Sequence, residues 1–104
     1  MCGITGKLHF NPNHPVDPAL IRRMNDCLVH RGPDDEGIWT HGPMGLSQRR
    51  LAIIDLSPTG HQPMCNEDGT IWITFNGEIY NHSQLRAAME ERGHSYRGTS
   101  DTET

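Results

Sequence analysis

The sequence of 104 residues predicts one small α+β domain, and three observations support that fold class. Short runs of alternating apolar residues indicate strands, and two apolar stripes at helical spacing indicate helices. Tight turns between consecutive strands favour hairpins over crossovers. The expected order of elements is β-α-β-β-β-α-β, which is typical of a mixed α+β fold.

The first strand is expected over residues 3–10, where apolar and polar side chains alternate. A turn rich in Asn and Pro follows over residues 11–15. Asp17 and Pro18 then supply the N-cap and the first-turn proline of a helix that runs to about His30. The apolar stripe of this helix consists of Leu20, Met24, Cys27 and Leu28.

An acidic loop over residues 31–37 separates this helix from a predicted hairpin. The hairpin strands are expected over 37–41 and 44–54, joined by a Gly-Pro turn. A loop rich in proline and glycine (56–63) precedes another strand over 70–75. One face of that strand would carry Ile71, Ile73 and Phe75.

Asn81 or Ser83 is expected to cap the second helix, which would run to Arg92. Gly93 suits the position after the helix, because glycine adopts the left-handed conformation without a Cβ clash. The apolar stripe consists of Leu85, Ala88 and Met89. Residues 94–97 are expected to form a last short strand.

The end of the sequence has the pattern of a loop that enters a helix. Ser100 or Asp101 would be the N-cap, and Glu103 would lie in the first turn. No helical stripe follows, so we expect residues 1–104 to be a domain that is incomplete at its C-terminus.

Composition argues against several classes of partner. The net charge is −4 without a basic run, which disfavours nucleic acid and anionic membranes. No apolar stretch is long enough to span a membrane, and no signal peptide is expected. Three cysteines without CxxC spacing indicate a reduced, cytoplasmic protein. Seven histidines show no metal-ligand spacing, so no metal is expected. The aromatic residues expected in the core are Trp39, Trp72 and Phe75.

Cys2 directly follows Met1, and this position has a chemical consequence. Removal of Met1 would leave Cys2 with both a thiol and a free α-amino group. Such groups ordinarily have pKa values of about 8.5 and about 7.7–8.0, so the amine suits a general base for the thiol. Position alone is also compatible with an ordinary residue, since any residue can stand second.

Three further polar positions each allow two interpretations. Asn76-Gly77 suits a hairpin turn, or an oxyanion hole made of a side-chain amide and a backbone N–H. Arg50 suits a surface charge, or a bidentate partner for a carboxylate. Asp101 suits a helix cap, or an acceptor for an ammonium group. Together with a thiolate, these groups would bind an α-amino acid that carries a side-chain carbonyl.

Ordered motifs carry a resemblance that covers essentially the whole chain. The motifs are Met1-Cys2-Gly3-Ile4, His30-Arg31-Gly32-Pro33-Asp34, Arg50-Leu51-Ala52-Ile53-Ile54-Asp55, Gln62-Pro63, Phe75-Asn76-Gly77-Glu78-Ile79-Tyr80-Asn81 and Ser100-Asp101. In this order they resemble the class II glutamine amidotransferase domain at the N-terminus of glutamine-hydrolysing asparagine synthetases.

The resemblance implies an N-terminal-nucleophile hydrolase with an αββα sandwich, in which two stacked sheets lie between helical layers. Cys2, exposed by removal of Met1, would be the nucleophile. Asn76 and Gly77 would be the oxyanion donors. The reaction implied is hydrolysis of L-glutamine to glutamate and ammonia.

The resemblance also implies how glutamine is held. Arg50 would bind its carboxylate and Asp101 its ammonium group, while Arg31 would lie near the nucleophile. Asn76, Gly77 and the following residues would line the same pocket: Leu51, Ala52, Ile53, Ile54 and Glu78.

The expected partner is a C-terminal synthetase domain that uses the ammonia to amidate aspartate, or another acceptor used by related synthetases. Mg-ATP is expected only in that domain, no cofactor is expected in this chain, and a homodimer is compatible with the sequence. Two alternatives remain open: a truncated, inactive remnant that retains the pocket, and a nonenzymatic interaction module.

Overall fold

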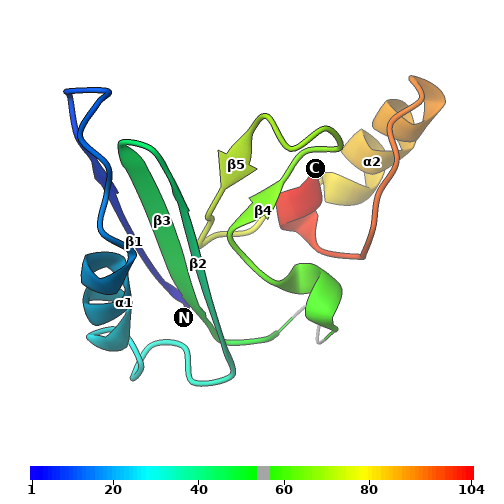
Figure 1. The fold of residues 1–104 in the computed structure, drawn as a ribbon. Helices are drawn as coiled ribbons and strands as arrows, with labels where there is room; N and C mark the ends of the chain where they lie inside the picture. Colours follow the sequence, from blue (N-terminus) through cyan, green and yellow to red (C-terminus); the bar gives the residue numbers. More distant parts are fainter. Residues whose placement is uncertain (54–56) are drawn as a thin grey trace.

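The computed structural model describes residues 1–53 and 57–104, and it confirms the α+β fold class (Figure 1). The described residues contain two α-helices, five strands and two single-turn 3₁₀ helices. In chain order they are β1 (Gly3–Leu8), α1 (Pro18–Asp26), β2 (Asp35–His41), β3 (Met44–Arg50), η1 (Pro58–Gly60), β4 (Met64–Cys65), β5 (Trp72–Ile73), α2 (His82–Glu91) and η2 (Asp101–Glu103).

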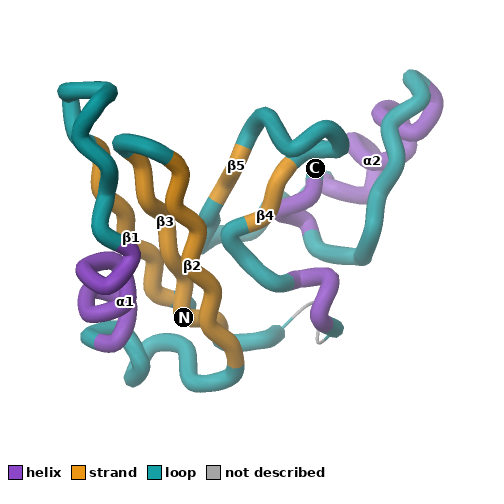
Figure 2. The backbone as a smooth tube through the Cα atoms, viewed as in Figure 1, coloured by secondary structure: helices purple, strands orange, loops and turns teal. Residues whose placement is uncertain are grey.

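Strands β1, β2 and β3 form an antiparallel sheet with β3 in the centre (Figure 2). Gly3 pairs with Arg49, and Asp35 pairs with Arg50. This register brings the start of β1, the start of β2 and the end of β3 together at one end of the sheet. Residues 1–2 and 51–53, which flank the paired strands, therefore meet there.

Helix α1 covers one face of this sheet, as Figure 1 shows. Its predicted N-cap is confirmed, because the Asp17 carboxylate accepts a hydrogen bond from the Ala19 N–H at 2.9 Å. Ile21, on the inner side of the helix, is fully buried, and Val16 lies beside it at 4% exposure. These two are the buried hydrophobic residues among those that the structure describes.

The other face of the sheet meets a second layer, made by the short β4–β5 pair with α2 beyond it (Figures 1 and 2). Side chains alternate along a strand, so neighbouring residues of β3 serve different layers. Arg49 reaches Asp26 in α1, whereas Gln48 reaches Gln62 in the second layer. The end of β3 thus connects both layers.

Helix α1 is shorter than predicted, since it ends at Asp26 and not near His30. The Asn25 carbonyl accepts from the Leu28 N–H at 3.0 Å and from the Arg49 Nε at 3.3 Å. An α-helix would need that carbonyl for the N–H four residues on. The chain continues instead in turns whose backbone N–H groups donate to the carbonyl three residues earlier.

The strands of the large sheet also end earlier than predicted. β1 ends at Leu8, because its partner strand β3 starts at Met44, opposite Leu8. β3 ends at Arg50, because the paired part of β2 stops at Asp35. Residues 51–53 of the strand predicted over 44–54 are therefore not part of β3, and residue 54 lies outside the described residues.

The second layer contains the largest departures from prediction. The strand expected over 70–75 is reduced to β5, and its partner β4 was not predicted. Asn66 explains the short pairing, because its side-chain oxygen accepts from the N–H groups of Thr70 and Ile71 in a turn. Ile71 is 67% exposed.

Residues 94–97 do not form the expected strand. Carboxylates occupy the backbone N–H groups that a partner strand would need. Glu67 accepts from the Ser95 N–H, and Glu103 accepts from the N–H groups of Arg97 and Gly98. The predicted end of α2 is correct, with Gly93 at φ +94° after it.

The aromatic residues expected in the core are only partly buried. Trp39 and Trp72 stack across the two layers, with ring centroids 4.9 Å apart. Phe75 is half-buried beside the predicted oxyanion residues. Among the residues described, no helix is long and apolar enough to cross a membrane, and no group of three His, Cys, Asp or Glu is placed to hold a metal ion.

Candidate active site

Cys2 lies where the ends of β1 and β3 meet, because Gly3 pairs with Arg49. The Leu51 N–H points at the Cys2 Sγ at 3.3 Å, and the thiol donates to the Leu51 carbonyl at 3.6 Å. The side chain is half-buried, and Met1 before it is 75% exposed.

Two predicted residues hold the backbone of Cys2. The Asn76 Nδ2 donates to the Cys2 carbonyl at 3.0 Å, and the Arg31 Nε donates to the same oxygen at 3.2 Å. Asn76 comes from the segment after β5, and Arg31 from the loop after α1. The amide of Asn76 therefore lies beside the residue that carries the thiol.

A cavity of about 360 Å³ opens beside Cys2. This volume is within the usual range of about 300–1,000 Å³ for small-molecule sites. Predicted site residues lining it are Cys2, Arg50, Leu51, Ile53, Asn76, Gly77, Glu78 and Asp101. Residues lining it that the sequence did not predict as site residues include Gln48, Gly60, Gln62, Tyr80 and Thr102.

Arg50 supplies a cation to this cavity from the last position of β3. Its Nη1 donates to the Ser57 carbonyl at 3.1 Å. The guanidinium also lies against Gly60, where an added Cβ would be only 2.2 Å from Nη2. Arg50 is therefore fixed from one side at the wall of the cavity, and a guanidinium has more N–H donors than this contact with Ser57 uses.

Asp101 supplies an anion to the same cavity and is only 5% exposed. Its Oδ2 accepts from the Ile79 N–H at 2.7 Å. Ser100 is the N-cap of η2, because its side chain accepts from the Thr102 N–H at 3.2 Å. The predicted cap is confirmed here, although the helix it starts is a single 3₁₀ turn.

Two predicted residues are not seen in the lining. Ala52 does not line the cavity, and its N–H donates to the Asp34 carboxylate at 2.9 Å. Ile54 lies outside the described residues. A second cavity of about 960 Å³, between the large sheet and Trp72, contains none of the predicted site residues.

Residues 1–104 match the profile of the glutamine amidotransferase domain family. The chain belongs to this family. The resemblance predicted from the ordered motifs is therefore confirmed over the whole chain.

Curated relatives of this amidotransferase domain are much longer than the chain. It is 44% identical over 105 residues to glutamine-hydrolyzing asparagine synthetase 1 of Bacillus subtilis, which covers 99% of the chain and 16% of the relative. It is 44% identical over 103 residues to the glutamine-hydrolyzing asparagine synthetase of Asparagus officinalis, covering 99% and 17%. It is 41% identical over 103 residues to glutamine-hydrolyzing asparagine synthetase 1 of Arabidopsis thaliana, and this match covers 99% of the chain and 17% of the relative.

The sequence offered a signal for two of the lining residues that it did not predict as site residues. Gln62 and Tyr80 both stand in the ordered motifs, but no chemistry was inferred for them. Gln48, Gly60 and Thr102 lie in none of these motifs, and only folding brings them to the cavity of this amidotransferase domain.

Proposed function

We propose that the chain is the glutaminase part of a glutamine-hydrolysing asparagine synthetase, in which Cys2 hydrolyses L-glutamine to glutamate and ammonia. The observation that carries this proposal is the cavity shared by Cys2, Asn76, Arg50 and Asp101. The cation and the anion match the carboxylate and the ammonium group of glutamine, and the thiol and the amide donor both match its side-chain carbonyl.

The first step begins after removal of Met1, which leaves the Cys2 amine as the general base. The Cys2 sulfur attacks the δ-carbon of glutamine, and the thiol proton passes to the amine. The carbonyl oxygen becomes an oxyanion that accepts from the Asn76 Nδ2 and the Gly77 N–H. Donors of this kind typically lower the barrier by about 3–4 kcal/mol each.

The second half of the reaction releases ammonia and then glutamate. The C–N bond breaks, the amine of Cys2 returns the proton, and ammonia leaves behind a thioester. Water then attacks the thioester carbonyl and releases glutamate, which restores the Cys2 thiol. Water enters as the second substrate, so no redox cofactor is required.

Substrate orientation follows from the two charged residues. Arg50 would bind the glutamine carboxylate with its remaining donors, and Asp101 would accept from the ammonium group. Glu78 and the backbone near Leu51 and Ile53 would complete the walls. This orientation presents the side-chain amide of glutamine to Cys2.

The finer fold assignment belongs to the same proposal. In an N-terminal-nucleophile αββα sandwich, two sheets pack between helices. The succession of α1, the large sheet, the β4–β5 pair and α2 supports that arrangement (Figure 1). We place Cys2 at the inner edge of the first sheet, facing the second.

The proposed partner is a synthetase domain in a longer protein, where ammonia would amidate aspartate at the expense of ATP. The names of the relatives support this acceptor. Mg-ATP would bind in that domain and not in this chain. A cytoplasmic location and a homodimer remain expectations from the sequence.

Mass spectrometry of the N-terminus combined with a glutaminase assay tests the proposal. Met1 should be absent, and Cys2→Ala should abolish glutamine hydrolysis while leaving any ammonia-dependent synthesis by the intact protein. Matched controls are Cys27→Ala and Cys65→Ala, which lie outside the cavity and should keep the activity. Hydrolysis by Cys2→Ala would refute the mechanism, and retention of Met1 would support an inactive remnant.

A further inference from the structure

Two glutamine side chains face each other behind the cavity, and both are buried. Gln48, in the middle of the large sheet, is 1% exposed, and Gln62, before β4, is 7% exposed. The Gln48 Nε2 donates to the Gln62 Oε1 at 2.8 Å. A buried amide pair is stable only when its polar atoms find partners, so its remaining contacts are informative.

Both amides of this pair bind the backbone of Phe75. The Gln62 Oε1 accepts from the Phe75 N–H at 2.7 Å, and the Gln48 Nε2 donates to the Phe75 carbonyl at 2.9 Å. The pair therefore contacts Phe75 as a neighbouring strand would. Phe75 directly precedes Asn76 and Gly77, so these contacts fix the backbone from which the oxyanion donors project.

The other end of the pair reaches the opposite wall of the cavity. The Gln62 Nε2 donates to the Thr102 Oγ1 at 3.1 Å. Thr102 follows Asp101 in η2, and Asp101 in turn accepts from the Ile79 N–H. One side chain, Gln62, thus touches both the segment that carries Asn76 and the turn that carries Asp101.

The orientation of the amides is set by their surroundings. Rotating the Gln48 amide by 180° would place its oxygen against two other oxygens, those of Gln62 and Phe75. As it stands, the Gln48 Oε1 is buried without a hydrogen-bond partner among the described residues. A buried unpaired acceptor typically costs about 1–3 kcal/mol, so the Nε2 contacts must outweigh this cost.

Sterics also favour this contact. Gly37 pairs with Gln48 in the large sheet, and the Gln62 carbonyl lies where a Cβ of residue 37 would be, at 1.8 Å. Any side chain at position 37 would push the Gln62 backbone away from the sheet. The absence of a side chain there lets Gln62 reach Gln48.

We propose that Gln48 and Gln62 are positioning residues that set the distance between the oxyanion donors and the ammonium-binding carboxylate. The proposal rests on the proposed glutaminase function. Gln48 acts on Asn76 through Phe75 and should govern kcat. Thr102 acts on Asp101 and should govern KM, while Gln62 contacts both sides and should affect both parameters.

The test compares variants of the intact protein in steady-state glutaminase assays. Gln48→Met keeps the side-chain volume and removes the amide, so we expect kcat to fall by about 10- to 100-fold with KM little changed. Thr102→Val should raise KM with kcat largely retained. Thr102→Ser keeps the hydroxyl and should have the KM of the wild-type protein. Gln62→Met should shift both parameters.

Ser47→Ala is the matched control, since Ser47 is a fully buried polar residue on the same strand with its side chain on the opposite face. It should leave kcat and KM unchanged. A readout independent of catalysis is amide hydrogen exchange around Phe75, which should accelerate in Gln62→Met and not in Thr102→Val.

The outcomes separate the two proposals. A wild-type protein without glutaminase activity would refute the proposed function, while faster exchange at Phe75 in Gln62→Met would still support the contact. An active wild type in which Gln48→Met and Thr102→Val change kcat and KM alike would overturn the positioning roles. Unchanged kinetics in Gln62→Met would overturn them as well.

Discussion

Cys2 owes its neighbours to strand pairing, because the residues that touch it are far away in the sequence. Leu51 is 49 positions from Cys2, and Asn76 is 74 positions away. A lone cysteine in second position says little, and its chemistry depends on what the fold brings to it. The sulfur meets a backbone N–H, and the adjacent carbonyl meets the amide of Asn76.

The role of a single residue can be tested at Arg50. Arg50→Lys keeps one positive charge but loses the planar fork that a carboxylate can bind with two parallel hydrogen bonds. We expect KM for glutamine to rise by about tenfold, with a smaller decrease in kcat. Steady-state kinetics at constant ionic strength measure both.

The structure adds a second reason for that result. The Arg50 guanidinium is anchored on the Ser57 carbonyl and packed against Gly60, and an ammonium group would fill that space poorly. Arg22→Lys is a suitable control, because Arg22 lies outside the cavity. An unchanged KM in Arg50→Lys would return Arg50 to the status of a surface charge.

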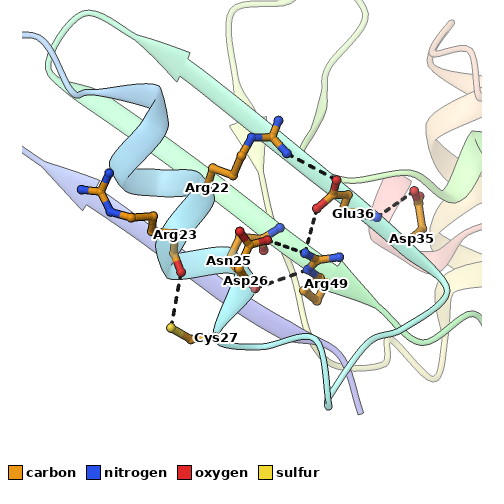
Figure 3. A network of polar contacts seen from close by, with 8 residues as sticks. All are labelled: Arg22, Arg23, Asn25, Asp26, Cys27, Asp35, Glu36 and Arg49. Carbon is orange, nitrogen blue, oxygen red and sulfur yellow. Dashed lines mark hydrogen bonds and ion pairs between the residues drawn. The ribbon is translucent and has the colours of Figure 1, made fainter.

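At the scale of elements, Arg49 joins α1 and β2 to the end of β3, as Figure 3 shows. Its guanidinium binds the Asp26 carboxylate at 2.6 Å and the Glu36 carboxylate at 2.9 Å. Its Nε also donates to the Asn25 carbonyl. The side chain is 14% exposed, so these contacts are better shielded from solvent than those of Arg22, at 59%.

Arg49→Met should therefore destabilise the protein by about 1–2 kcal/mol, since both carboxylates are half-exposed and can be rehydrated. Arg22→Met removes only an exposed pair at 3.4 Å to Glu36 and should change stability by less than about 0.5 kcal/mol. Urea unfolding of the intact protein measures both. Equal effects of the two substitutions would contradict the role given to Arg49.

Which elements the sequence predicts depends on how local their causes are. The cap at Asp17, the hairpin of β2 and β3 and the end of α2 at Gly93 follow from neighbouring residues. Residues 94–97 fail as a strand because Glu67 and Glu103 bind their N–H groups. Such distant carboxylates leave no trace in local periodicity.

The same distinction applies to the candidate site. Cys2, Asn76, Arg50 and Asp101 were predicted because ordered motifs carry them, and all four line one cavity. Gln48 was not predicted, because a glutamine in a strand has no characteristic pattern. Its partner contacts arise only when the large sheet meets the second layer.

At the scale of the whole molecule, the site belongs to neither layer alone. Cys2 and Arg50 come from the large sheet, whereas Asn76 and Asp101 come from the segments beyond it. Any change in the packing of the layers would alter the distance between Cys2 and Asn76, the proposed nucleophile and oxyanion donor. In the proposed mechanism this packing therefore affects turnover, which is why the buried amides of Gln48 and Gln62 are informative.

The last prediction concerns residues 1–104 prepared as a separate chain. Large apolar side chains are widely exposed on it, including Phe10 at 98%, Tyr80 at 93% and Ile71 at 67%. The strands β4 and β5 have only two residues each, and their outer edges are not paired with other described strands. Exposed apolar patches and open strand edges promote association.

We therefore expect the separate chain to self-associate, to bind a hydrophobic dye and to hydrolyse glutamine slowly or not at all. Light scattering coupled to size-exclusion chromatography measures the association, and urea unfolding measures the cooperativity. Ile71→Ser, on the exposed apolar face, should reduce association without touching the cavity. A monomer that unfolds cooperatively and turns over glutamine as fast as a full-length relative would contradict the prediction, because the exposed surface would then need no cover.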